Sequence, residues 1–222
     1  MAGCSATRSF TAPAIERETV THFGRRVTPL GKLADTGNFP TGGNLTPDGR
    51  FYWAVDTGRD VNYVWTVEVA TGTVKQKLPL PGGGGHVAFS PDGKTAYVPG
   101  QPDGGREFPE GTPERKAAGG NALHVYAIDT ATGLATQGDP ISIPSSANPL
   151  MAVGSSRSNN SVVAGGGTAF EISEWPDDIA ISPDGKTLLV ALLNSDRAAI
   201  VNTETKAVTV VTVGAYPRGA AI

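Results

Sequence analysis

Short apolar runs separated by turn residues are the main pattern of the chain from about residue 26 onward. The runs are rich in β-branched and aromatic residues, which favour half-buried strands. No segment has the sustained apolar stripe at i, i+3, i+4 and i+7, with capping residues at its ends, that an amphipathic helix requires. The pattern therefore predicts an all-β chain.

A four-residue signal, Ser or Thr followed by Pro-Asp-Gly, begins at Thr46, Ser90 and Ser182. Each copy stands between two short apolar runs. Proline presets φ for the first turn position, aspartate bonds to the backbone nearby, and glycine accepts a positive φ. The signal therefore predicts β-hairpin turns, and starts that lie 44 and 92 residues apart indicate an internal repeat.

A second marker follows each hairpin and predicts a turn from a third strand into a fourth. Its copies occupy residues 67–72, 127–133 and 201–206, and fourth strands are expected over about 73–80, 135–143 and 207–213. A unit of about 44 residues with four antiparallel strands is the blade of a β-propeller. The predicted blades cover about residues 41–81, 82–144 and 175–214.

Two stretches exceed the repeat length and predict inserted loops. Residues 101–120 add about 18 residues to the second blade, and residues 145–174 separate the second blade from the third. Both stretches are rich in loop-forming residues: Gly, Pro and charge in the first, Ser, Gly and Asn in the second. A degenerate extra blade in the second stretch is the alternative, but that stretch has no Pro-Asp-Gly turn and is short for a blade.

The two ends of the repeat region suggest an incomplete ring. Residues 26–34 are expected to form an outer strand without a blade of their own, and residues 216–222 repeat the segment that precedes each Pro-Asp-Gly turn. The expected architecture is therefore a partial β-propeller of three blades plus the first strand of a fourth. Its partners would be the missing blades of a longer parent protein.

Residues 5 to about 21 have no apolar period, and residues 1–25 are expected to be a flexible leader. Small residues before Cys4 resemble the end of a bacterial lipoprotein signal, although no hydrophobic stretch precedes them and no intact signal peptide is present. Two interpretations stay open, an ordinary start with a chance cysteine and a start clipped from a longer precursor.

Composition and charge exclude several classes of function. The 222 residues have a formal net charge of −3 and no dense basic run, so the electrostatic footprint of a nucleic-acid binder is missing. The longest apolar run, residues 188–193, is far shorter than the ~18 residues that span a membrane. The single cysteine permits neither an internal disulfide nor a cysteine-based zinc site.

Aligning the segments before each hairpin places four polar residues at one mouth of the central channel. These candidates for catalysis are His86, Asp177, Asp178 and Arg218. An Asp pair with a histidine can act as acid and base or hold a metal, and arginine can hold a carboxylate or phosphate. The alternative is that they are polar because a propeller rim is wet. The sequence gives no sign of a cofactor.

The Gly-Lys-Thr segments at 93–95 and 185–187 fit a permissive phosphate-loop pattern. A phosphate loop needs a helix after it and free backbone N–H groups. Here proline removes a donor, aspartate repels anions and a strand is expected to follow, so both segments are interpreted as turns.

Residues 87–98 and 179–190, together with the Asp-Thr-Ala-Thr-Gly sequence at 129–133, resemble the YVTN-type repeats of lactonase-like β-propellers. Residues 39–43 leading into 46–56 resemble, more narrowly, the N-terminal propeller of large secreted bacterial phosphoesterases. The resemblance implies a parent with seven blades, an extracytoplasmic location, and a hydrolase domain that follows the propeller. A divalent metal is implied only for that parent.

Two functions follow from this resemblance as expectations. The first is a non-catalytic repeat module, a binding or scaffold part of an exported bacterial protein with a phosphoesterase domain. The second is a lactonase-like hydrolase of the 6-phosphogluconolactonase type. A fragment of a propeller is not expected to be an active enzyme alone, because a fold by itself assigns no activity.

Overall fold

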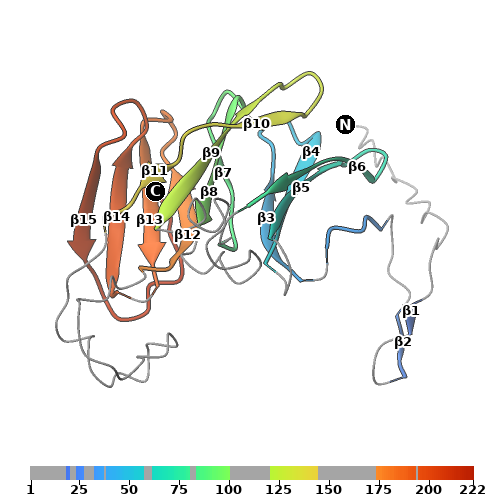
Figure 1. Cartoon of the computed structure of the whole chain (residues 1–222), viewed down its shortest axis with the longest axis horizontal. Helices are drawn as coiled ribbons and strands as arrows, with labels where there is room; N and C mark the ends of the chain where they lie inside the picture. Colours follow the sequence, from blue (N-terminus) through green and yellow to red (C-terminus); the bar gives the residue numbers. More distant parts are fainter. Residues whose placement is uncertain are drawn as a thin grey trace, which may run out of the picture.

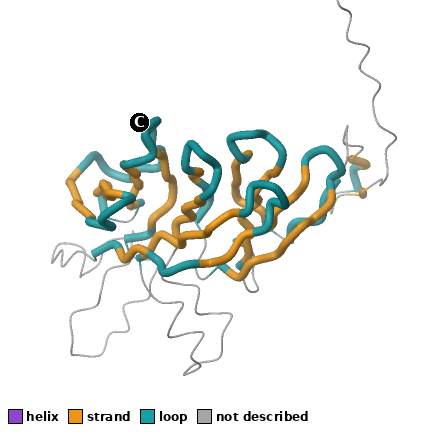
Figure 2. The backbone as a smooth tube through the Cα atoms, turned by 90° about the horizontal axis from the view of Figure 1, so that it is seen from above, coloured by secondary structure: helices purple, strands orange, loops and turns teal. Residues whose placement is uncertain are grey.

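The structure is a computed structural model of the chain. It describes residues 19–20, 24–27, 33–37, 39–57, 62–80, 84–100, 121–144, 174–193 and 195–222. These ranges contain strands and loops and no helix, as Figure 2 shows. Three antiparallel sheets stand side by side in chain order (Figure 1). Among the described residues, no helix has the length and hydropathy needed to cross a membrane.

Each sheet is one blade, with strands in chain order from the inner to the outer edge. Blade 1 contains β3 (Pro40–Leu45), β4 (Phe51–Asp56), β5 (Tyr63–Glu68) and β6 (Thr73–Pro79). Blade 2 contains β7 (Ala88–Phe89), β8 (Thr95–Gly100), β9 (Ala122–Ile128), β10 (Ala135–Gln137) and β11 (Ile141–Ser142). Blade 3 contains β12 (Pro176–Ile181), β13 (Thr187–Leu192), β14 (Arg197–Asn202) and β15 (Val208–Thr212). The predicted fold class of four-stranded antiparallel propeller blades is confirmed.

Blade 2 departs from the prediction of one continuous fourth strand. Its outer edge is split into β10 and β11, which pair with the two ends of β9. Gly138 and Pro140 lie between the two pieces, and proline has no N–H group to donate to a ladder. The predicted insertions at 101–120 and 145–174 fall outside the described residues, except for Glu174 at the end of the second.

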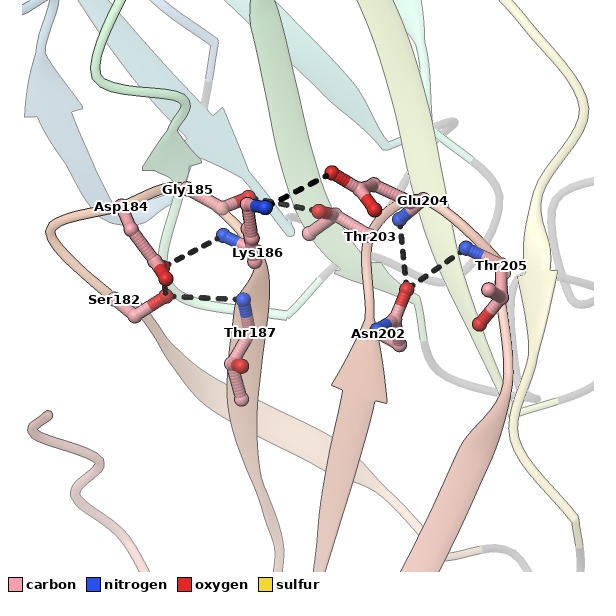
Figure 3. Close-up of polar contacts among 9 residues, drawn as sticks. All are labelled: Ser182, Asp184, Gly185, Lys186, Thr187, Asn202, Thr203, Glu204 and Thr205. Atoms are coloured by element: carbon pink, nitrogen blue, oxygen red, sulfur yellow. Dashed lines mark hydrogen bonds and ion pairs between the residues drawn. The ribbon is translucent and has the colours of Figure 1, made fainter.

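The Pro-Asp-Gly signals form the hairpin turns between the first two strands of each blade. In blade 3, Ser182 Oγ donates to Asp184 Oδ1 at 2.6 Å, and that oxygen also accepts the Lys186 N–H at 3.0 Å (Figure 3). Gly185 has φ +74°, which favours glycine. Thr46 with Asp48 and Ser90 with Asp92 repeat the hydroxyl–carboxylate bond at 2.6 Å. The recurring signal is therefore a turn in all three blades, and the Gly-Lys-Thr segments lead into strands.

Two apolar cores hold the blades together, one between each pair of neighbours. Fully buried Trp53 of blade 1 makes edge-to-face contacts with Phe89 and Tyr126 of blade 2. The second core joins blade 2 to blade 3 through residues that include Leu123 and Leu188. Side chains alternate across each strand, so every blade offers one apolar face to the blade before it and one to the blade after it.

The segments flanking the blades differ from expectation. β2 (Arg26–Val27) pairs with β1 (Thr19–Val20), away from the three blades in Figure 1, so the described part of the predicted outer strand 26–34 belongs to no blade. Residues 216–222 do not form a strand. The inner strand of every blade bonds to the strand that follows it, and within this sequence residues 216–222 have no such strand to pair with.

Candidate functional site

The inner edges of blades 1 and 2 touch through their backbones. A Cβ atom added to Gly42 would lie 1.7 Å from the carbonyl oxygen of Gly85, so only glycine fits there. Asn44 Nδ2 donates to the carbonyl oxygen of Val87 at 3.1 Å and joins the same two segments. The inner segments therefore lie side by side, which places their first residues at one rim. His86 lies just before β7, as predicted, whereas Asp177 and Asp178 lie within β12 and not before it.

Asp178 ties three successive inner segments together at this rim. Its Oδ1 contacts Nδ1 of His86 from blade 2 and also accepts the N–H of Ile179 at 2.8 Å. Its Oδ2 accepts the N–H of Ala220 at 2.8 Å. The Asp178 side chain is 13% exposed, whereas that of His86 is 51% exposed. Both carboxylate oxygens are thus occupied by contacts within the protein.

Asp177 and Arg218 complete the group and interact electrostatically. Partial burial raises the pKa of the Asp177 carboxyl above its usual value, and the neighbouring Asp178 adds to that rise. Electrostatic interactions with His86 and Arg218 act in the opposite direction on the Asp177 pKa. Burial is the largest of these effects, so Asp177 holds its proton more tightly than an exposed aspartate.

The structure brings all four sequence-predicted rim residues into one neighbourhood. The arrangement offers a carboxyl with a raised pKa, an exposed imidazole and a guanidinium, which suits proton transfer or the binding of an anion. Within the described ranges, no three His, Cys, Asp or Glu side chains form a group able to hold a metal ion. Two hollows lie elsewhere. One, of about 310 Å³, lies between the hairpin turns of blades 1 and 2, and the other, of about 410 Å³, lies on the face of blade 1 that points away from blade 2.

A buried ion pair near the same end of blade 3 escaped sequence reasoning. Fully buried Glu174 pairs with Arg197, whose Nε donates to Glu174 Oε2 at 3.2 Å and whose Nη2 contacts Oε1. The Glu174 N–H donates to Asn121 Oδ1 of blade 2 at 2.8 Å. Glu174 was predicted to lie in an inserted loop, and no spacing in the sequence connects it to Arg197.

Residues 216–222 begin as blade 3 does, although they form no strand. Tyr216 and Trp175 both precede a proline and have φ of 56° and 52°, in the left-handed region that few non-glycine residues adopt. Ala220 then reaches Asp178 as described above. The repeat alignment predicted a fourth inner segment. Its backbone path is as predicted, but these residues form no strand.

Comparisons with known proteins agree with this architecture. The family model described as "Lactonase, 7-bladed beta-propeller" matches residues 42–101. No curated protein sequence matches the chain. The matched residues run from the inner strand of blade 1 to the end of β8, and they include two of the three hairpin signals.

Three solved structures illustrate the likeness. A functionally unknown protein from Desulfotomaculum acetoxidans has a TM-score of 0.57 and 15% identity, over 86% of this chain and 48% of its own. Hydrazine synthase from Kuenenia stuttgartiensis has a TM-score of 0.55 and 16% identity, over 90% of this chain and 56% of its own. A protein from Bacteroides fragilis described as a candidate 6-phosphogluconolactonase has a TM-score of 0.53 and 16% identity, over 81% of this chain and 40% of its own.

The chain spans about half the length of these structures. At such low identity, the likeness concerns the fold alone, and the three named proteins differ in what they are described to do. The chain has a lactonase-like β-propeller fold.

Proposed function

We propose that the chain is a non-catalytic β-propeller module that acts by binding or as a scaffold. The observation that supports this is the occupied carboxylate of Asp178. One of its oxygens contacts His86 and accepts the Ile179 N–H, and the other accepts the Ala220 N–H. A carboxylate held in this way joins the inner segments and has little capacity left to accept a proton from a substrate.

The module would belong to an exported bacterial protein that carries a phosphoesterase domain. The support for this is the sequence resemblance of residues 39–43 and 46–56, together with solved structures that are about twice as long as the chain. Reading the genomic DNA around the coding region tests it. Further repeats followed by a domain rich in Asp and His metal ligands are expected, and no further repeats in any frame would contradict it.

The second candidate function is a lactonase-like hydrolase, and Asp177 is the observation that favours it. A half-buried carboxyl with a raised pKa is a better base for activating water than an exposed one, provided that it is deprotonated at the working pH. Arg218 would hold the carboxylate or phosphate of a sugar-acid substrate. Asp177 would take a proton from water as the water oxygen attacks the lactone carbonyl, and would return that proton to the ring oxygen as the ester bond breaks.

Hydrolysis of gluconolactone and its 6-phosphate, measured by pH-stat at pH 7, separates the two functions. The non-catalytic module is expected to give no rate above spontaneous hydrolysis, in the wild type and in His86→Ala, Asp178→Ala and Asp177→Asn alike. Asp184→Asn is the matched control, because Asp184 lies in an exposed hairpin turn. A rate that Asp177→Asn abolishes and Asp184→Asn retains would overturn the non-catalytic proposal in favour of the hydrolase.

A further inference from the structure

The hollow between the hairpin turns of blades 1 and 2 has an apolar, buried lining. Its volume is about 310 Å³, and it is lined by Phe51, which is 2% exposed, and Ile128, which is 8% exposed. Pro47 and Pro91 line it from the two turns. The two turns lie close together, because a Cβ atom added to Gly93 would lie 3.6 Å from Pro47 Cδ. The hollow therefore lies inside the row of blades and not at either end of it.

Two aspartates, Asp48 and Asp92, bring negative charge to this hollow from opposite turns. The hydroxyl group at the start of each turn is the largest cause that lowers the pKa of the aspartate, so both carboxylates are ionised at neutral pH. The basic residue that follows each turn lowers that pKa less than the hydrogen bonds do. Its hydrogen bonds lead Arg50 elsewhere, since its guanidinium donates to the carbonyl oxygens of Thr130 and Ala131 at 3.1 Å.

Each of these carboxylates has one occupied oxygen. In both turns, Oδ1 accepts a bond of 2.6 Å from the Ser or Thr hydroxyl and a bond of 3.1 Å from a backbone N–H two residues later. Two such bonds use both lone pairs of that oxygen. In the part of the chain that the structure describes, Oδ2 of neither aspartate accepts a hydrogen bond from another residue. Each turn therefore offers a single carboxylate oxygen to a ligand.

Single oxygens on two separate turns favour an ammonium group over a guanidinium group. A guanidinium binds best to both oxygens of one carboxylate, in a planar pair. An ammonium has three donors that can reach oxygens on different groups. The apolar lining of the hollow also suits the four-carbon stem of lysine, which packs on apolar surface while its charged end stays near water.

The next junction along the row already contains a lysine of the chain itself. Lys206, in the turn after β14 of blade 3, donates from Nζ to the carbonyl oxygen of Thr203 at 2.6 Å and lies 5.9 Å from the ring centroid of Tyr97 in blade 2. Blade 2 has Gly133 at the equivalent turn position, with φ +74° where Lys206 has +62°. Blade 2 therefore contributes no side chain from this position to its junction with blade 1.

We infer that the hollow takes a lysine side chain of a partner protein, with the stem on the apolar lining and the ammonium between Asp48 and Asp92. This inference rests on the proposed binding function, to which it gives the partner chemistry. Each inner strand begins at the rim and ends at its hairpin turn, so the site lies at the opposite end of the blades from His86 and Asp178. The two ends can therefore be tested separately.

Titration of the isotope-labelled 222-residue chain with Nα-acetyl-lysine N-methylamide, followed in two-dimensional amide spectra at pH 7, tests the inference. Saturable shift changes are expected at the N–H groups of Gly49, Gly93 and Thr130. The norleucine derivative has the same stem without the charge and is expected to bind about tenfold more weakly or less. The arginine derivative is expected to bind more weakly than the lysine derivative, because no carboxylate offers it two oxygens.

Variants separate charge from shape. The double variant Asp48→Asn, Asp92→Asn is expected to weaken binding about tenfold or more, and Thr130→Phe, which fills the hollow without changing charge, is expected to abolish it. Asp184→Asn is the matched control. Asp184 makes the same turn contacts in blade 3 but does not line the hollow (Figure 3). Thermal melting establishes that each variant folds.

Several results would overturn the inference: no shift changes at about 20 mM lysine derivative, equal affinity for the norleucine or arginine derivative, or an equal loss in Asp184→Asn. Loss of lysine binding alone would leave the non-catalytic proposal standing. A lactonase rate that depends on Asp177, with lysine binding intact, would overturn the non-catalytic proposal and leave this site in place.

Discussion

Asp178 of blade 3 is in direct contact with the imidazole of His86 in blade 2, ninety-two residues earlier in the chain. The same carboxylate accepts a backbone N–H from Ala220, so a single side chain connects three inner segments. Neighbouring blades also meet through the two apolar cores and through single polar contacts, such as the bond from Asn44 Nδ2 to the carbonyl oxygen of Val87. The contact therefore gives the inner rim a polar tie that fixes how neighbouring blades sit at their narrow edge.

Replacing Asp177 with asparagine is expected to stabilise the protein at neutral pH. Partial burial raises the pKa of Asp177 in the folded state above its ordinary value of 3.8. Its stabilising contribution is therefore present below about pH 3.8 and is lost as the pH rises through the folded pKa. Urea unfolding of Asp177→Asn should show a higher free energy of unfolding than wild type at pH 7 and no gain at pH 3. An equal or lower stability at pH 7 would contradict the effect of burial.

The hairpin aspartates Asp48, Asp92 and Asp184 are expected to stabilise the protein at neutral pH and to lose that effect in acid, the reverse of Asp177. The hydroxyl of Ser182 bonds to Asp184 and is the largest cause that lowers the pKa of its carboxyl, and Asp48 and Asp92 have equivalent partners. Their contribution to the free energy of unfolding is present above the ordinary pKa of 3.8. It is lost as the pH falls toward the lowered pKa of the folded state.

A triple variant tests this sign. Asparagine at positions 48, 92 and 184 keeps a hydrogen-bond acceptor and removes the charge, so the variant should be less stable than wild type at pH 7. It should also show a weaker loss of stability between pH 4 and pH 2, measured by urea unfolding at each pH. Parallel curves for the variant and the wild type would show that these carboxylates do not carry the acid sensitivity.

Replacing Arg197 with methionine is expected to cost about 3–5 kcal/mol, because it removes the guanidinium that pairs with the fully buried carboxylate of Glu174. Lys186→Met is the matched control. Its partner Glu204 is 3.6 Å away and both side chains are more than half exposed, so the loss should stay below about 1 kcal/mol. Guanidinium unfolding of both variants measures the difference, and equal losses would refute the distinction between the two pairs.

A methyl group at Gly42 is expected to separate blades 1 and 2 at their inner edge. The Cβ of Gly42→Ala would lie 1.7 Å from a backbone oxygen that cannot turn away, and overpacking of this kind typically costs about 1–3 kcal/mol or more. Gly214→Ala is the control, since nothing lies within 4 Å of the added atom and φ is not in the left-handed region. Thermal melting should show a clear loss for the first variant and almost none for the second.

The sequence predicted those features that depend on local signals. The turns at Thr46, Ser90 and Ser182 require particular residues at adjacent positions. The recurrence of this four-residue signal therefore revealed the turns and the blades around them. The four rim residues were found together because equivalent repeat positions occupy equivalent places in space. Gly138 and Pro140 are a local cause of the split in the fourth strand of blade 2. That both pieces stay paired with β9 depends on the packing of the sheet and not on these two residues.

Other features depend on contacts between distant residues and left no signal in one sequence. The pairing of Glu174 with Arg197 and the close approach of Gly42 to Gly85 arise from how the blades pack. The strand expected over residues 26–34 followed the apolar pattern, which identifies a strand but not its partner. In the structure the available partner for Arg26–Val27 is Thr19–Val20.

The central claim is that the rim carboxylate holds blades together, and a double-mutant cycle on His86 and Asp178 tests it most directly. The free energies of unfolding of the wild type, His86→Ala, Asp178→Ala and the double variant are measured in urea at pH 7. A structural tie predicts a coupling energy of about 0.5–3 kcal/mol, with Asp178→Ala the more harmful single change because it also frees the Ala220 N–H. Additive losses, with no coupling between the two residues, would contradict it.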